Sequence, residues 1–177
     1  MDVITAIHTR RSIRAYTPAP VVRALLEQVI LDAAQTPPPF RGQVPWTFNV
    51  ATGTDHIAAL GQAAMRHARA IRGDEPGWDW LDRPGMDIFW GAPALIVISG
   101  PQADCCRAGQ TLMLAAHARG LGTCWVGAPL PWLRTAPGRA ALAIPPDLAP
   151  QVAMCIGHPR DLPDPDPKPR PPIIWSG

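Results

Sequence analysis

The side chains best suited to chemistry in this chain are cationic and lie near its two ends. The run Arg10-Arg11-Ser12-Ile13-Arg14 places three guanidinium groups and a hydroxyl within five residues, and Lys168 and Arg170 follow near the other end. A guanidinium offers a planar fork of donors that matches phosphate oxygens, and a lysine adds a compact charge. If folding brings the two ends together, these groups form a pocket for a small dianion such as a phosphate. The alternative is that they are solvated surface residues.

No other group of residues forms a catalytic or metal site in the sequence. The five histidines are scattered, and His56 and His67 are too far apart on one predicted helix to share a metal. The four cysteines include no C-x-x-C pair, which leaves zinc-ribbon and thioredoxin-type sites without support. A nucleophile elbow, a P-loop and a Rossmann fingerprint are also absent from the sequence. An enzyme built on this chain therefore needs a cofactor that brings its own reactivity.

Composition narrows the class of protein. The chain has 177 residues, of which 47% are hydrophobic and 17% charged, as expected for a single domain with a real core and not for a disordered chain. A net charge of +2 is too small for a general nucleic-acid binder. The longest apolar run, over 92–99, is only strand-sized, and the N-terminus lacks the layout of a signal peptide. We therefore expect no contact with nucleic acid or membrane, and a cytoplasmic protein with reduced thiols.

Hydrophobic periodicity predicts an α+β domain in which helices alternate with strands. Helices are expected over 3–9 after an Asp2 cap, from Pro20 to about 33, from a Thr54 cap to about 71, over 103–119 and over 137–143. Strands are expected over 46–52, 94–98, 123–127 and 151–157.

Three further features of the pattern can be placed on these elements. The helix over 103–119 is small or apolar nearly all round, so we expect it to be central and buried, and to end at Gly120 and Gly122. One domain spans 1–177, and the proline-rich stretch over about 159–177 is expected to form an extended arm. Such an arm must lie on something, for which a partner subunit is one candidate and a frayed tail the alternative.

Four segments, in order and spanning almost the whole chain, resemble the FMN-dependent nitroreductase superfamily. The first, over 10–14, resembles the family's R-R-S-x-R element, and the second, over 36–46, its A-P-S-x-x-N-x-Q-P-W loop. The third, over 110–127, is similar to its central helix followed by G-L-G-x-x-W-x-G, and the fourth, over 168–171, to its closing K-x-R-x-P. Each motif alone is weak, but four in the right order are specific.

The resemblance implies a nitroreductase-like fold, with a central mixed or antiparallel sheet flanked by helices, in an intertwined homodimer that binds FMN at the subunit interface. Within it, the first and fourth segments are implied at the FMN phosphate, the second against the ring from the neighbouring subunit, and the backbone near Val126 and Gly127 close to the reactive N5. No side chain is implied as a catalyst, and no metal. The implied FMN-binding residues are Arg10, Arg11, Ser12, Arg14, Pro38, Pro39, Phe40, Arg41, Gln43, Trp125, Val126, Gly127, Lys168 and Arg170.

The loop over 36–46 departs from the family's pattern. Pro38 stands where serine is usual, Arg41 stands where asparagine is usual, and Val44 is inserted before Pro45-Trp46. These departures bear on the polar contacts that the loop normally gives the flavin edge. Arg41 can still donate a hydrogen bond, and a cation near the N1–O2 edge stabilises the anionic reduced flavin.

The activity implied by the resemblance is that NAD(P)H reduces FMN, which then reduces a nitroaromatic, a quinone or another electron-poor acceptor. The alternatives are a flavin-dependent biosynthetic oxidase or dehydrogenase, and a flavin-binding carrier with little turnover, because one fold supports many functions. Trp78 and Trp80 could form an aromatic lid over the substrate or plug a small core. Trp90 is expected in a core or an interface, and Cys124 in packing.

Overall fold

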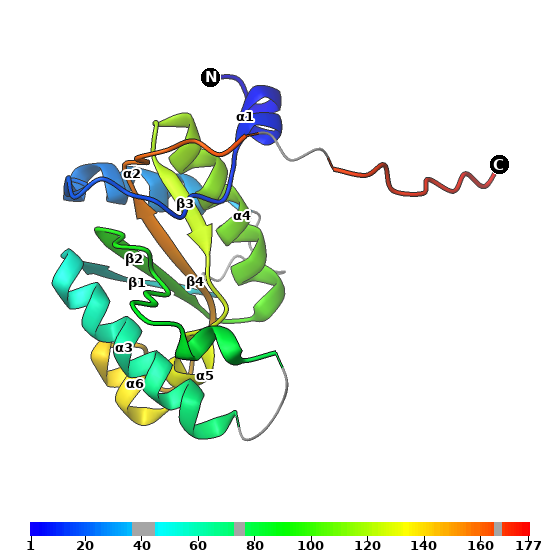
Figure 1. The fold of residues 1–177 in the computed structure, drawn as a ribbon. Coiled ribbons are helices and arrows are strands. Elements are labelled where there is room, and N and C mark those ends of the chain that lie inside the picture. Colours follow the sequence, from blue (N-terminus) through cyan, green and yellow to red (C-terminus); the bar gives the residue numbers. More distant parts are fainter. Residues whose placement is uncertain (37–44, 73–76, 165–167) are drawn as a thin grey trace.

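The computed structural model describes residues 1–36, 45–72, 77–164 and 168–177 and shows a four-stranded sheet with helices on both faces (Figure 1). The strands are β1 (Thr47–Thr52), β2 (Ala94–Ser99), β3 (Gly122–Trp125) and β4 (Pro150–Gly157), in the order β1-β2-β4-β3. All three neighbouring pairs are antiparallel. The prediction of an α+β fold with a central antiparallel sheet is confirmed.

The five predicted helices lie at or near their predicted places in the described chain. Asp2 caps the first through a bond from the Thr5 backbone N–H (3.0 Å), as predicted. None of the described helices is long and apolar enough to cross a membrane. They are α1 (Val3–Thr9), α2 (Arg23–Ala33), α3 (Thr54–Ile71), α4 (Gln102–Ala118), α5 (Leu130–Leu133) and α6 (Ala136–Ala141), with a 3₁₀ turn η1 (Asp79–Asp82).

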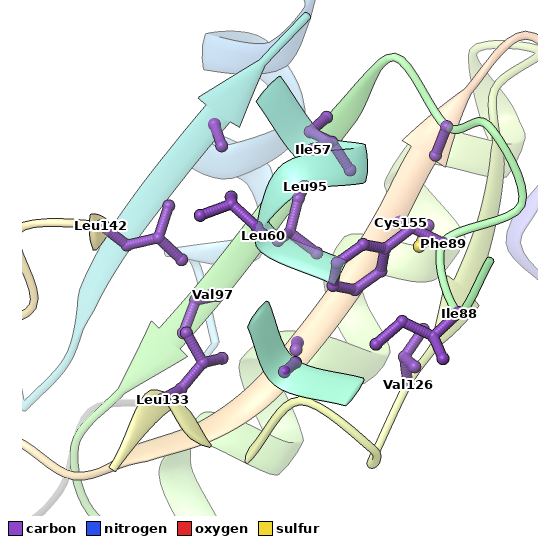
Figure 2. Packing of buried hydrophobic residues seen from close by; sticks show 14 of the residues in the cluster. Ile57, Leu60, Ile88, Phe89, Leu95, Val97, Val126, Leu133, Leu142 and Cys155 are labelled. Carbon is purple, nitrogen blue, oxygen red and sulfur yellow. The ribbon is translucent and has the colours of Figure 1, made fainter. Parts of the chain in front are cut away.

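The sheet separates two hydrophobic cores. Helices α2 and α4 cover one face, where their apolar sides pack on Ile96, Ile98 and Met154. Helices α3, α5 and α6 and the loop over 83–92 cover the other face, and Figure 2 shows their side chains converging on Leu95, Val97 and Cys155. Strand β2 lies between β1 and β4, so all six of its residues are buried. This explains its continuous apolar run.

Two predicted helix starts are wrong. Helix α2 begins at Arg23 and not at Pro20, because Val21 is buried in the core and Val22, the N-cap, is still extended. Thr54 is the first residue of α3 and does not cap it, because the cap position is held by Gly53 at φ 94°, a backbone conformation that favours glycine.

Other differences concern α4 and the elements around it. Only one side of α4 is buried, and Ala103, Gln110 and Ala118 on the other side are exposed, so the helix is not buried all round within one chain. Gly120 ends α4 as predicted, at φ 75°, whereas Gly122 begins β3. Turn η1 and helix α5, each of four residues, were not predicted, because such short elements carry no periodicity to recognise.

Among the exposed apolar side chains of the described residues, two groups lie near the ends of the chain. On α1, the side chains of Val3, Ile4 and Ile7 are 51–63% exposed. On the segment over 168–177, which contains no helix or strand, Ile174 and Trp175 are 93% and 87% exposed. Figure 1 shows this segment leading away from the body of the protein. The homodimer stays a prediction.

Candidate functional site

The segment after α1 is tied to the edge of the sheet. Ser12 forms a parallel bridge with Thr123 of β3, and the Ile13 backbone N–H donates to the Thr123 carbonyl (2.9 Å). Four residues after Ile13, the chain lies beside the end of β4, where the Thr17 N–H donates to the His158 carbonyl (2.9 Å). Backbone bonds therefore fix the predicted R-R-S-x-R element before any ligand arrives.

Glycine makes this close approach possible. A Cβ added at Gly122 would lie 2.6 Å from Ile13 Cγ1, and one added at Gly157 would lie 2.5 Å from a ring carbon of Pro93 and 2.8 Å from the ring of Tyr16. Real Cβ contacts are essentially never this short. Gly122 and Gly157 are paired with each other at one end of the β3–β4 pair, so they make room there for Ile13 and for Tyr16 against the sheet.

The five residues of the segment divide between two sides. Ile13 is buried over β3, whereas Arg14 is exposed and Ser12 is half-buried. Because alternate residues of an extended chain point the same way, Arg10, Ser12 and Arg14 share the side opposite Ile13. Arg11 turns back toward the end of α1, where its Nη1 donates to the carbonyls of His8 and Arg10 (both 2.8 Å).

Within the described residues, no carboxylate forms an ion pair that neutralises the positive charge of this segment. No ion pair joins Arg10, Arg11 or Arg14 to an acidic side chain within the described residues. The Arg11 Nε is buried there and has no hydrogen-bond partner. Uncompensated cations beside a hydroxyl suit an anionic ligand, so the residues present fit a phosphate group.

His117, near the end of α4, connects this segment to α1. Its Nε2 lies 2.8 Å from the hydroxyl of Thr9, which donates its own hydrogen to the Thr5 carbonyl (2.7 Å). The neutral ring of His117 therefore donates from Nε2 to Thr9. Burial lowers the pKa of His117, and the charges of Arg10 and Arg11 lower it further.

Two pockets flank the segment. The first, of about 490 Å³, is mostly apolar and lies between the ends of α1 and α4, with Arg10, His117 and Leu162 among its lining residues. The second, of about 420 Å³, lies between residues 14–16 and the loop over 83–90, with Arg14 and Arg83 at its edge. Arg10 thus lines the first pocket and Arg14 the second.

The strand leaving the site places its residues on opposite faces of the sheet. The ring of Trp125 packs against α4, where a Cβ on Gly109 would lie 3.0 Å from it, whereas Val126 is buried in the core of the other face. The Val126 N–H is bonded to the Ala153 carbonyl (2.8 Å). Gly127 is exposed, and an added Cβ would meet nothing within 4 Å. Its backbone is thus open to a planar ligand.

Cys124 faces Cys155 across the β3–β4 pair, and both are buried. Burial raises the pKa of the Cys124 thiol, and the nearby charges of Arg14 and Arg10 offset only part of that rise. Burial also raises the pKa of Cys155 well above its ordinary value. These protonated, enclosed thiols fit the interpretation that Cys124 serves packing.

The remaining predicted site residues fall into two groups. Pro38, Pro39, Phe40, Arg41 and Gln43 lie outside the described residues. Lys168 and Arg170 are exposed on the segment that leads away from the body (Figure 1). A role for these residues stays a prediction, and for Lys168 and Arg170 it requires another arrangement of the arm.

The loop before β2 contains site residues that the sequence did not suggest. Arg83 and Asp87 line the second pocket, and the Trp90 ring centroid lies 5.5 Å from the guanidinium carbon of Arg14. No motif marks Arg83 or Asp87 in the sequence, where this loop shows only a cluster of tryptophan, glycine and proline.

Trp78 and Trp80 stack on each other, with ring centroids 6.3 Å apart, and pack against the core that contains Phe89. This favours the prediction that they plug a small core over the prediction that they form a lid over the substrate.

The sequence of this chain is similar to those of known proteins. The model of the Nitroreductase family matches residues 7–158. A protein of Methanothermobacter thermautotrophicus, provisionally named an NADH dehydrogenase/NAD(P)H nitroreductase, is 33% identical over 94% of this chain and 85% of its own length.

Solved structures show the same fold. A nitroreductase of Bacteroides fragilis with bound FMN superposes with a TM-score of 0.86 and 20% identity, over 100% of both chains. A nitroreductase of Desulfitobacterium hafniense, also with bound FMN, gives a TM-score of 0.86 and 21% identity, again over 100% of both chains.

Proposed function

The chain belongs to the nitroreductase family, and from that membership we propose that it is a cytoplasmic, FMN-dependent NAD(P)H oxidoreductase. The observation that carries the proposal is the cationic side of Arg10, Ser12 and Arg14, which no carboxylate neutralises within the described chain and which lies beside two pockets. The names of similar proteins support NAD(P)H as the donor. The four free cysteines suit a reducing compartment.

Each of the proposed site residues would bind a particular part of the cofactor. Arg10 and Arg14 would bind the phosphate oxygens through charge-assisted hydrogen bonds, and Ser12 would add a hydroxyl between them. Lys168 and Arg170 are proposed to complete the phosphate site in the assembled protein. The segment is already fixed to β3 and β4, so little ordering remains when the ligand binds.

When bound, FMN would accept a hydride from NAD(P)H at N5 and pass two electrons to an electron-poor acceptor. The open backbone at Gly127 would leave the ring accessible. The buried residues Val126 and Ile88 would keep water from one side of the site. No side chain of the chain is required as an acid or base, since solvent can protonate a reduced nitro or quinone product.

We propose further that the protein is a homodimer with FMN at its interface. The exposed apolar residues of α1 and of the arm support this, because Val3, Ile4, Ile174 and Trp175 gain by burial against a second chain. A molar mass from light scattering tests it directly. A monomer at micromolar concentration would contradict the dimer.

The cofactor is tested by purifying the protein and recording its absorbance. We expect a yellow protein with a flavin spectrum, or a colourless one that becomes yellow when FMN is added. Anaerobic addition of NADH or NADPH is then expected to bleach the flavin band. A nitroaromatic or quinone is expected to restore it.

The outcomes separate the alternatives. A protein that takes up no FMN contradicts the flavin proposal. A yellow protein that neither nicotinamide nucleotide bleaches favours a flavin carrier. One that NAD(P)H does not bleach, but that a specific organic substrate does, favours a biosynthetic oxidase or dehydrogenase.

A further inference from the structure

Trp90 adopts a backbone conformation that a bulky residue rarely takes. Its φ is 53°, in the left-handed region where glycine and asparagine are usual. Such strain persists only where the surrounding structure enforces it, and it concentrates at functional sites. We therefore ask which contacts hold Trp90 in this conformation and what its ring contacts as a result.

The cause is a tight turn held from both ends. One carboxylate oxygen of Asp87 accepts from the Phe89 N–H (2.8 Å) and the other from the Gly91 N–H (2.7 Å). Ile88 and Phe89 are 4% and 1% exposed, and Figure 2 shows both side chains pointing into the core beside Val126 and Cys155. Trp90 thus follows two anchored residues and cannot relax without moving them.

On the other side of the turn, the Trp90 ring contacts a cationic side chain. The half-buried Trp90 ring faces Arg14, with 5.5 Å between its centroid and the guanidinium carbon. Both residues line the pocket of about 420 Å³, together with Arg83 and Asp87. Both oxygens of Asp87 accept backbone N–H groups of the turn. Within the described residues Asp87 forms no ion pair with Arg14, whose guanidinium lies over the Trp90 ring.

We propose that Trp90 is a positioning residue for Arg14. Its ring, held in place by the strained turn, restricts the guanidinium through a cation–π contact without neutralising its charge. Arg14 then loses less rotamer freedom when an anion binds. That the anion is the FMN phosphate or its neighbouring polar groups rests on the proposed function. The positioning of Arg14 rests on the contacts alone.

A double-mutant cycle tests the proposal by measuring the FMN dissociation constant of the apoprotein. Trp90→Leu is expected to weaken FMN binding about threefold to tenfold, and Trp90→Phe by less, because Phe keeps a weaker aromatic face. In an Arg14→Ala background, Trp90→Leu is expected to cause no further loss. Equal losses in both backgrounds would show a merely structural role and overturn the proposal.

Two more variants control for folding. Trp90→Asn removes the ring but suits the left-handed backbone, so it is expected to fold and to lose FMN affinity as Trp90→Leu does. Trp132→Leu removes a tryptophan that packs against the same core but lines a different pocket, and it is expected to leave FMN affinity unchanged. Wild-type affinity in a folded Trp90→Asn variant would overturn the proposal.

The experiment also separates this inference from the proposed function. If the wild-type protein binds no FMN, the proposed function fails, and the cycle is repeated with inorganic phosphate as the ligand. The same coupling between Trp90 and Arg14 is then expected. Additive effects with phosphate would overturn the positioning role as well.

Discussion

The two cationic segments of this chain have similar charge but very different support. Residues 10–14 follow a capped helix and are bonded to β3, where Gly122 leaves room for Ile13. Lys168 and Arg170 lie on an exposed segment with no helix or strand, leading away from the body (Figure 1). The first segment is fixed to the sheet by backbone bonds within the single chain, whereas the second is exposed and contains no helix or strand.

A phosphate site built from these two segments would be only half formed in the single chain. A half that is already fixed binds an anion with little loss of freedom, whereas a half without helix or strand loses more freedom on binding or on subunit association. The apolar residues Ile173, Ile174 and Trp175 follow directly after the second cationic segment. We infer that burial of these residues against another chain would bring Lys168 and Arg170 into use.

The largest effect is expected from removing residues 168–177. If the arm supplies half of the phosphate site and part of the dimer, its deletion should weaken FMN binding about a hundredfold or more, since each charge-assisted hydrogen bond contributes about 1.5–3 kcal/mol. Titration of FMN and light scattering measure the two effects. Unchanged affinity would mean that residues 10–14 hold the cofactor alone.

Single arginine substitutions measure the contribution of each cationic segment to FMN binding. Arg10→Ala and Arg170→Ala are each expected to cost about 1.5–3 kcal/mol of FMN binding, through loss of one partner of a dianion. Arg170→Ala should leave the melting temperature of the apoprotein unchanged, because Arg170 is exposed. An unaltered dissociation constant for Arg170→Ala would remove that residue from the site.

Two glycine substitutions test separately the packing of residues 10–14 on the sheet and the access of FMN to the backbone at Gly127. Gly122→Ala is expected to destabilise the fold by about 1–3 kcal/mol, because its Cβ would overlap Ile13. Gly127→Ala meets nothing and should leave the free energy of unfolding unchanged, yet it should hinder FMN if the ring lies there. Denaturant unfolding and FMN titration measure both. Equal unfolding energies for Gly122→Ala and the wild type would contradict the close seating.

The smallest effect concerns pH. The pKa of His117 is lowered by burial and then by Arg10 and Arg11, so below about pH 6.5 the unfolded chain binds a proton that the folded chain refuses. Stability should therefore fall as the pH drops through this range. His117→Gln keeps a donor for Thr9 but cannot titrate, so its melting temperature should fall about 2 °C less than that of the wild type between about pH 7.5 and pH 5.5. An equal fall in both would exclude His117.

The elements with strong periodicity could be predicted from the sequence, and so could the family. Strand β2 shows a continuous apolar run because it is buried on both faces, and α3 was placed to within a residue at each end. The start of α2 could not be predicted, because it depends on the burial of Val21, a tertiary effect that no local pattern records.

The candidate site was only partly visible in the sequence. Arg10, Ser12 and Arg14 are recognisable because cations and a hydroxyl alternate along a short extended segment. Trp90 is not, because its position depends on a left-handed backbone that tryptophan itself disfavours and that Asp87 enforces. The spatial link between residues 14 and 90 comes from two loops meeting at the edge of the sheet, which local spacing does not encode.

The enclosed pair Cys124 and Cys155 has a consequence for chemical durability. Reduced flavins react with oxygen to give peroxide, and peroxide attacks thiolates far faster than thiols. Because burial raises the pKa of both residues, they stay protonated beside the proposed cofactor site. We therefore expect peroxide formed at the proposed cofactor site to oxidise these two thiols only slowly.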